Sequence, residues 1–236
     1  MHVSIADPVE PHRKAIAPVW HTCVLAAAIV ALGIGGLAGS QPASPPSALP
    51  FYLSAIAFEW LLFAYVWWGI RLRKYPLAAL ISRGHSSLLK GDLAVGLAIW
   101  LCWYVVESFV ALGLSHAGIS NAGAQGTVFP HGVGEIALWI LMAASSGFSE
   151  EIAFRGYFLQ QFSRWTGSTA IGIVIQAVLF GVGHTYLGTR QVVLIIVSGA
   201  LLGVFAAWLR NLRPLMITHA WADIFGGIIV HGLPYK

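Results

Sequence analysis

Long apolar stretches, separated by short polar connections, recur along the whole chain. Each is about 20 residues long, the length that an α-helix needs to cross the hydrocarbon core of a bilayer. The stretches lie at about 19–38, 51–70, 92–114, 134–154, 168–187, 191–209 and 214–231. The pattern therefore predicts an all-α, multispanning transmembrane bundle of about seven helices, or of eight if residues 155–167 make a further crossing.

The composition fits a chain that lies within a membrane. Hydrophobic residues make up 58% of the 236 residues and charged residues only 9%, whereas an ordinary soluble domain carries roughly 25% charged residues. So few charges could not cover the surface of a soluble fold. We therefore expect residues 1–236 to form a single integral membrane domain whose surroundings are the lipid bilayer.

The distribution of basic residues predicts an orientation. The net charge is +4, and all of the 13 Lys and Arg residues except Arg190 and Lys236 fall on the side reached after an even number of crossings. By the positive-inside rule, the N-terminus is expected to be cytoplasmic, as in a protein of the cell inner membrane. The basic residues form no continuous stripe, which argues against nucleic acid as a partner.

Acidic residues inside apolar stretches are the first candidates for function. An ionisable side chain in the bilayer costs several kcal/mol unless it is paired, neutralised or facing a polar cavity. Five acids lie in or at the edge of such stretches: Glu59, Glu107, Glu150, Glu151 and Asp223. Glu59 and Glu107 belong to no motif, and we interpret them as partners within the bundle or as interfacial groups.

Glu150 and Glu151 are adjacent in sequence, so on a helix their carboxylates point in different directions. Glu151 stands four residues before Arg155, which is the favourable order for an ion pair on one helical face. Glu150 lies about 100° further around the helix. We therefore expect Glu151 to pair with Arg155 and Glu150 to remain able to accept a proton, as a general base must.

Two histidines add to this set of polar residues. His184 lies near the end of the fifth apolar stretch, and His219 stands four residues before Asp223 at the start of the seventh. That spacing puts His219 and Asp223 on one helical face, where the carboxyl could orient the imidazole or both could stabilise an oxyanion. Together with Glu150 these residues predict a water-activating site inside the bundle.

Three motifs occur in a fixed order along the second half of the chain. They are Glu-Glu-x-x-x-Arg (Glu150, Glu151, Arg155), Phe-x-x-x-His (Phe180, His184) and His-x-x-x-Asn/Asp (His219, Asp223). This ordered set resembles the signature of the CAAX protease and bacteriocin-processing family (CPBP, also called Abi), over about residues 134–231. Three motifs in order, each on an expected membrane helix, are far more specific than any one of them.

The resemblance implies an intramembrane endopeptidase that cleaves a peptide or protein substrate. In the family, the first glutamate and the first histidine activate water, which assigns Glu150 and His184 to this role. The second histidine and the Asn/Asp support the oxyanion, which assigns His219 and Asp223. Glu151, Arg155 and Phe180 are then supporting residues. Because an ionised Asp223 cannot donate a hydrogen bond, it must be protonated or must act by orienting His219.

Metal dependence and two other functions remain open at this stage. Two glutamates and two histidines could bind zinc, but the chain has no His-Glu-x-x-His pair, and we expect no cofactor. One alternative is a catalytically silent member that binds a peptide, as in bacteriocin immunity. Another is a proton-coupled transporter that uses Glu107, Glu150 and His184, although the chain shows no internal repeat of the kind found in many transporters.

The depth of His184 places a condition on the site. The expected topology puts Glu150 and His219 toward the cytoplasmic half, whereas His184 comes late in a stretch that runs outward. The residues can meet only if this fifth helix is short, tilted, or broken at Gly181 or Gly183.

Overall fold

The computed structural model describes residues 14–38, 48–82, 89–119, 129–130 and 132–230, and every regular element in these ranges is helical. The α-helices are α1 (Val19–Ala38), α2 (Ala48–Leu72), α3 (Leu77–Ile81), α4 (Leu89–His116), α5 (Val133–Glu150), α6 (Leu159–Thr166), α7 (Thr169–Gly183), α8 (Thr189–Leu209) and α9 (Arg213–Ile224). Two π-helices, η1 (Glu151–Phe158) and η3 (Phe225–Val230), and one 3₁₀ turn, η2 (Thr185–Leu187), complete the set.

The expected multispanning helical bundle is confirmed. Among the described residues, four helical segments are long and apolar enough to cross a membrane: 48–72, 91–116, 133–166 and 189–209. The segments 19–35 and 169–183 are shorter apolar helices. Helix α9 occupies the first part of the seventh expected stretch, 214–231. Helices of this length and hydropathy are typical of an integral membrane protein.

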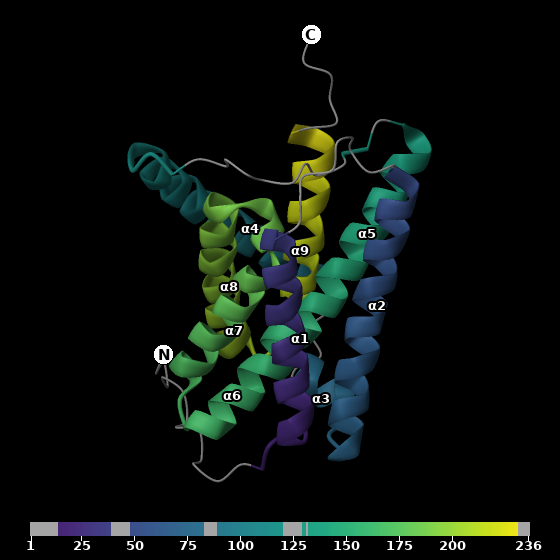
Figure 1. The fold of residues 1–236 in the computed structure, drawn as a ribbon, viewed down its shortest axis with the longest axis vertical. Coiled ribbons are helices and arrows are strands. Elements are labelled where there is room, and N and C mark those ends of the chain that lie inside the picture. The colour runs from purple at the N-terminus through teal and green to yellow at the C-terminus, as the bar shows by residue number, and fades with distance from the viewer. Residues whose placement is uncertain (1–13, 39–47, 83–88, 120–128, 131, 231–236) are drawn as a thin grey trace.

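The fourth expected span is longer than the apolar pattern indicated. Helices α5, η1 and α6 form one continuous rod that runs diagonally through the bundle in Figure 1. The rod ends where Gly167 adopts a left-handed conformation with φ 69°, and the Ser168 side chain then caps α7 by accepting from the Ile171 amide. Residues 155–166 therefore extend the fourth helix and do not form a separate crossing.

Helix α5 lies between α2 and α9, and α9 in turn packs on α4. The contact of α5 with α9 depends on Gly147, because a Cβ at this position would lie 2.8 Å from both the Met216 carbonyl oxygen and the Ala220 amide nitrogen. On the other side of the bundle, α7 packs on α8 and α6. Since Gly147 and Glu150 lie in the last turn of α5, this close approach sets how near α9 comes to the site.

Helix α1 crosses in front of the diagonal rod in Figure 1 and is attached to it by buried polar side chains. Gln161 accepts from the Ile16 amide and donates to the Ala17 carbonyl and to the Thr22 hydroxyl. The Tyr157 hydroxyl lies 2.8 Å from both His21 Nδ1 and Thr22 Oγ1. These bonds satisfy buried polar groups that would otherwise be costly, so His21 has a structural role here.

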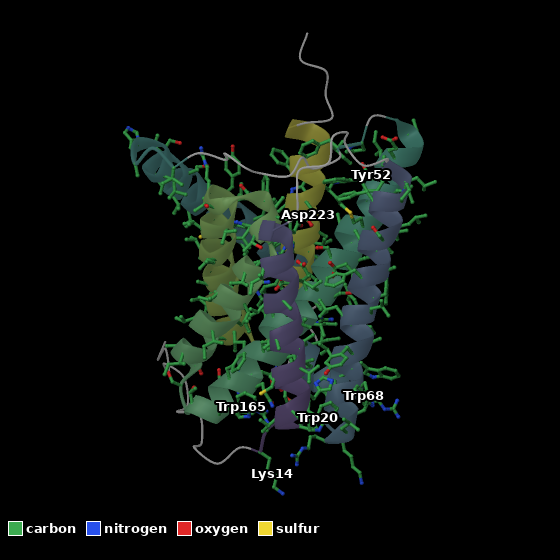
Figure 2. The ribbon with its side chains drawn as sticks, in the orientation of Figure 1. Lys14, Trp20, Tyr52, Trp68, Trp165 and Asp223 are labelled. Carbon is green, nitrogen blue, oxygen red and sulfur yellow. The ribbon has the colours of Figure 1, made fainter. Side chains whose placement is uncertain are left out.

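One end of the bundle carries tryptophans beside a basic residue. Figure 2 shows Trp20, Trp68 and Trp165 at the level just above Lys14. Aromatic side chains at this depth are typical of the boundary between hydrocarbon and headgroups. These tryptophans beside Lys14 fit the expected cytoplasmic edge, and the orientation of the chain in the membrane stays a prediction.

Candidate active site

The residues of the three motifs meet where the diagonal rod, α7 and α9 converge. Glu150 is the last residue of α5, and the π-helix η1 begins at Glu151. A π-helical turn inserts an extra residue into the helical repeat and is often found at functional sites. All eight residues of η1 are buried, which shows that this irregular turn is enclosed by the bundle.

Glu150 lies between the two histidines. Its Oε1 atom is 3.8 Å from His184 Nε2, and its Oε2 atom is 3.4 Å from His219 Nε2. Ser146, one turn earlier on α5, donates to Glu150 Oε2 at 3.4 Å. The Glu150 side chain is 9% exposed, so its carboxyl is nearly enclosed and faces imidazole nitrogens from two other helices.

Glu151 makes two close contacts. Its Oε1 atom is 3.0 Å from the Arg155 guanidinium, as the spacing of four residues predicts, and 2.8 Å from His219 Nδ1. The Arg155 contact is an ion pair without good hydrogen-bond alignment. Because a carboxylate only accepts, His219 Nδ1 donates to Glu151. The orienting partner of His219 is therefore Glu151, a contact that the motif spacing did not indicate.

Phe180 forms an aromatic wall beside these charges. Its ring centroid is 4.3 Å from Arg155 Cζ, 4.9 Å from the His184 ring and 6.0 Å from the His219 ring. A guanidinium over an aromatic face is attracted to the negative face of the ring, more strongly when water is excluded. Phe180 thus packs against both histidines and the buried cation, which explains its place in the second motif.

Helix α7 is short, which satisfies the condition on depth. It ends at Gly183, and His184 follows as its C-cap residue before the 3₁₀ turn η2. His184 Nδ1 lies 2.8 Å from the Phe180 carbonyl oxygen and donates to it, because a carbonyl only accepts. In the neutral ring the Nε2 lone pair then faces Glu150. The end of α7 therefore lies at the depth of Glu150.

Asp223 lies at the outer side of the site. Its Oδ2 atom is 3.9 Å from His219 Nε2, and its side chain is 35% exposed. Ser146 also contacts this carboxyl, while the Asp223 backbone carbonyl accepts from Trp139 Nε1 at 3.0 Å. Asp223 is thus near the site, as expected, but the short contact to the imidazole belongs to Glu151.

Two further residues that belong to no motif lie at the site. Glu59 on α2 is 7% exposed and close enough to Glu150, His219 and Asp223 to interact with them electrostatically. The Tyr186 ring stacks on the His184 ring at 6.0 Å, and Tyr186 interacts electrostatically with Glu59 and Glu150. Glu59 could have been found from its position in an apolar stretch, but Tyr186 carries no such signal.

The arrangement does not form a preorganised metal site. Within the part of the chain that the structure describes, no group of three or more His, Cys, Asp or Glu side chains converges as metal ligands. Glu151 Oε1 and His219 Nδ1 are bound to each other, so neither of these two atoms is available as a ligand. Metal independence remains a prediction that a binding measurement must test.

Comparison with known families gives one match. Residues 132–225 match the family model described as type II CAAX prenyl endopeptidase Rce1-like. Comparisons with curated proteins and with solved structures gave no match. The matched segment runs from the loop before α5 to the start of η3 and contains every residue of the three motifs.

Proposed function

We propose that this membrane protein hydrolyses a peptide bond of a peptide or protein substrate, with water activated by Glu150 and His184. The proposal is supported by the match of residues 132–225 to the family model described as type II CAAX prenyl endopeptidase Rce1-like. The observation that carries the mechanism is the position of the Glu150 carboxyl, which lies within 3.8 Å of an imidazole nitrogen on each side.

The first step is attack of water on the substrate carbonyl. The 3.8 Å between Glu150 Oε1 and His184 Nε2 is too long for a direct hydrogen bond. A water about 2.8 Å from both atoms fits this distance and would be held by two polar groups. Glu150 accepts one proton from the water, and the remaining hydroxide adds to the carbonyl carbon.

His219 is placed to stabilise the oxyanion that forms. An imidazolium has an N–H donor on each nitrogen, which suits a ring with Glu151 at Nδ1 and Glu150 at Nε2. In this state the Nε2–H group can donate to the developing negative charge. Glu151 acts as a positioning residue because its contact holds the ring in place, and Asp223 assists only if it is protonated.

Collapse of the tetrahedral intermediate completes the reaction. The carbon–nitrogen bond breaks, and the proton held by Glu150 passes to the leaving nitrogen, so that an amine and a carboxylic acid are released. This sequence needs no metal ion, because Glu150 supplies the base and His219 the electrostatic stabilisation.

Cleavage of a peptide library by the purified protein in detergent or lipid nanodiscs tests the proposal. Glu150→Gln keeps the size and polarity of the side chain but removes the base, and we expect a loss of about 10²- to 10⁴-fold in kcat/KM. Glu107→Gln is the matched control, because Glu107 is another carboxylate of the spans and bonds with Ser198 on α8. It should retain activity.

The outcomes separate the proposed function from its rivals. Peptide binding without cleavage by the wild type would indicate a silent peptide-binding protein. Proton-coupled uptake into vesicles that is lost in both variants would indicate a transporter. Full activity of Glu150→Gln on a confirmed substrate would show that another residue is the base.

A further inference from the structure

Glu59 is a buried carboxyl at the active site that the mechanism does not use. It lies on α2, which packs against α5, and it interacts electrostatically with Glu150, His219 and Asp223. The residue is 7% exposed, and its Oε2 atom is buried without a hydrogen-bond partner among the described residues. A buried acid in a membrane span is costly unless it is neutralised, paired or facing a polar cavity, and such acids are often functional.

The charges around the site are not balanced. Its acids are Glu59, Glu150, Glu151 and Asp223, whereas its bases are Arg155, His184 and His219. The guanidinium of Arg155 is 3.0 Å from Glu151, and both side chains are fully buried, so this cation is already paired. If all four carboxyls were ionised, their charge would exceed that of the three bases by one even with both imidazoles protonated, so one carboxyl must be neutral or must meet a further cation. Glu59, whose Oε2 atom has no hydrogen-bond partner among the described residues, is the carboxyl that such a cation could pair with.

An aromatic residue at the site, Tyr186, would suit an organic cation. Tyr186 interacts electrostatically with Glu59 and Asp223, and its ring is partly exposed beside His184. A carboxylate together with an aromatic face is a common arrangement for ammonium and guanidinium groups. A divalent metal would need several converging ligands, and the described residues hold no such cluster.

We propose that Glu59 determines specificity by binding a positively charged side chain, Lys or Arg, adjacent to the peptide bond that is cleaved. This inference rests on the proposed function, because it assigns a substrate class to the same site. The flexible stem of Lys or Arg lets the charge reach Glu59 while the backbone carbonyl lies between Glu150 and His219. Glu59 then becomes paired only when such a substrate is bound.

The test uses peptides that differ only in one residue next to the cleaved bond, with Lys, Gln or Glu at that position. For the wild type, kcat/KM should be highest with Lys, by at least about 10-fold over Gln. In Glu59→Gln this ratio should fall toward one, and in Glu59→Lys the Glu peptide should become the best substrate. The control Glu107→Gln should keep the preference of the wild type.

Each result decides the question. A wild type with no preference for Lys would overturn the proposal without any variant. An equal loss on all three peptides in a folded Glu59→Gln protein would assign Glu59 to proton transfer or structure. If zinc raised the melting temperature of the wild type but not of Glu59→Gln, the cation would be a metal and the proposal wrong.

Failure of the proposed function would be recognised separately. If the wild type cleaves none of the peptides, their affinities are measured by fluorescence in the Glu150→Gln background, with and without Glu59→Gln. Preferential binding of the Lys peptide that Glu59→Gln abolishes would support the cation site even in a protein without protease activity. Equal affinities would refute it.

Discussion

The buried contact between Glu151 and Arg155 yields a quantitative prediction. Both side chains are fully buried at 3.0 Å, and Glu151 also binds His219 at 2.8 Å. Glu151→Gln removes the carboxylate that pairs with the buried guanidinium, and removing one partner of such a pair costs about 3–5 kcal/mol. For a chain of 236 residues, this corresponds to a fall of roughly 6–20 °C in melting temperature, at about 2–4 °C per kcal/mol.

The partner substitution and the double variant complete a thermodynamic cycle. Arg155→Met removes the cation but leaves Glu151 bonded to His219, so we expect a smaller loss of about 1–3 kcal/mol. The double variant buries neither charge and should recover about 2 kcal/mol or more relative to the sum of the single losses. Its activity should remain low, because His219 has lost its carboxylate partner.

Thermal and denaturant melts in detergent, run beside the peptide assay, measure both quantities. Arg71→Met is the control, because this arginine lies at the end of α2 over Trp67 and its loss should cost about 0.5 kcal/mol. A Glu151→Gln protein that melts within about 2 °C of the wild type, or strictly additive losses in the double variant, would refute the reasoning.

Three other outcomes follow from the structure. Gly147→Ala should push α9 away from α5, because the added Cβ would meet backbone atoms of α9; we expect a loss of about 1–3 kcal/mol in stability and a lower kcat. Gly134→Ala on the same helix is the control: its Cβ would meet nothing within 4 Å, so melting temperature and kcat should not change. Gln161→Leu should destabilise the protein by about 1–3 kcal/mol, because it leaves the Ile16 amide and Ala17 carbonyl without their partner. Thermal melts measure this loss, and an unchanged melting temperature would contradict the role of Gln161. Thorough chelation should leave activity intact; stoichiometric zinc, with activity that falls and returns with the metal, would overturn the metal-free mechanism.

The local parts of this protein follow from its sequence. The apolar stretches predict the helices because each must satisfy its own backbone in lipid, so length and hydropathy are sufficient to locate it. The pair Glu151 and Arg155 follows from a spacing of four residues on one helix. The order of the three motifs places the candidate site in the second half of the chain, where the family match also lies.

The distances across the site depend on packing between helices. Glu151 and His219 are 68 residues apart in sequence, and their contact requires the close approach of α5 and α9 at Gly147. Glu59 reaches the site because α2 packs beside α5. Neither contact is visible in helical periodicity, since a spacing pattern describes one helix and carries no information on which face meets another helix.

The end of α7 shows the same division between local and tertiary information. The stretch 168–187 is uniformly apolar enough to predict a full span, yet the helix stops at Gly183. Gly181 packs directly against Ile196 and Val192 of α8, and Thr185 donates to the Gly33 carbonyl of α1. Hydropathy records only that these residues avoid water; contacts from two other helices decide where the chain turns, and therefore that His184 lies beside Glu150.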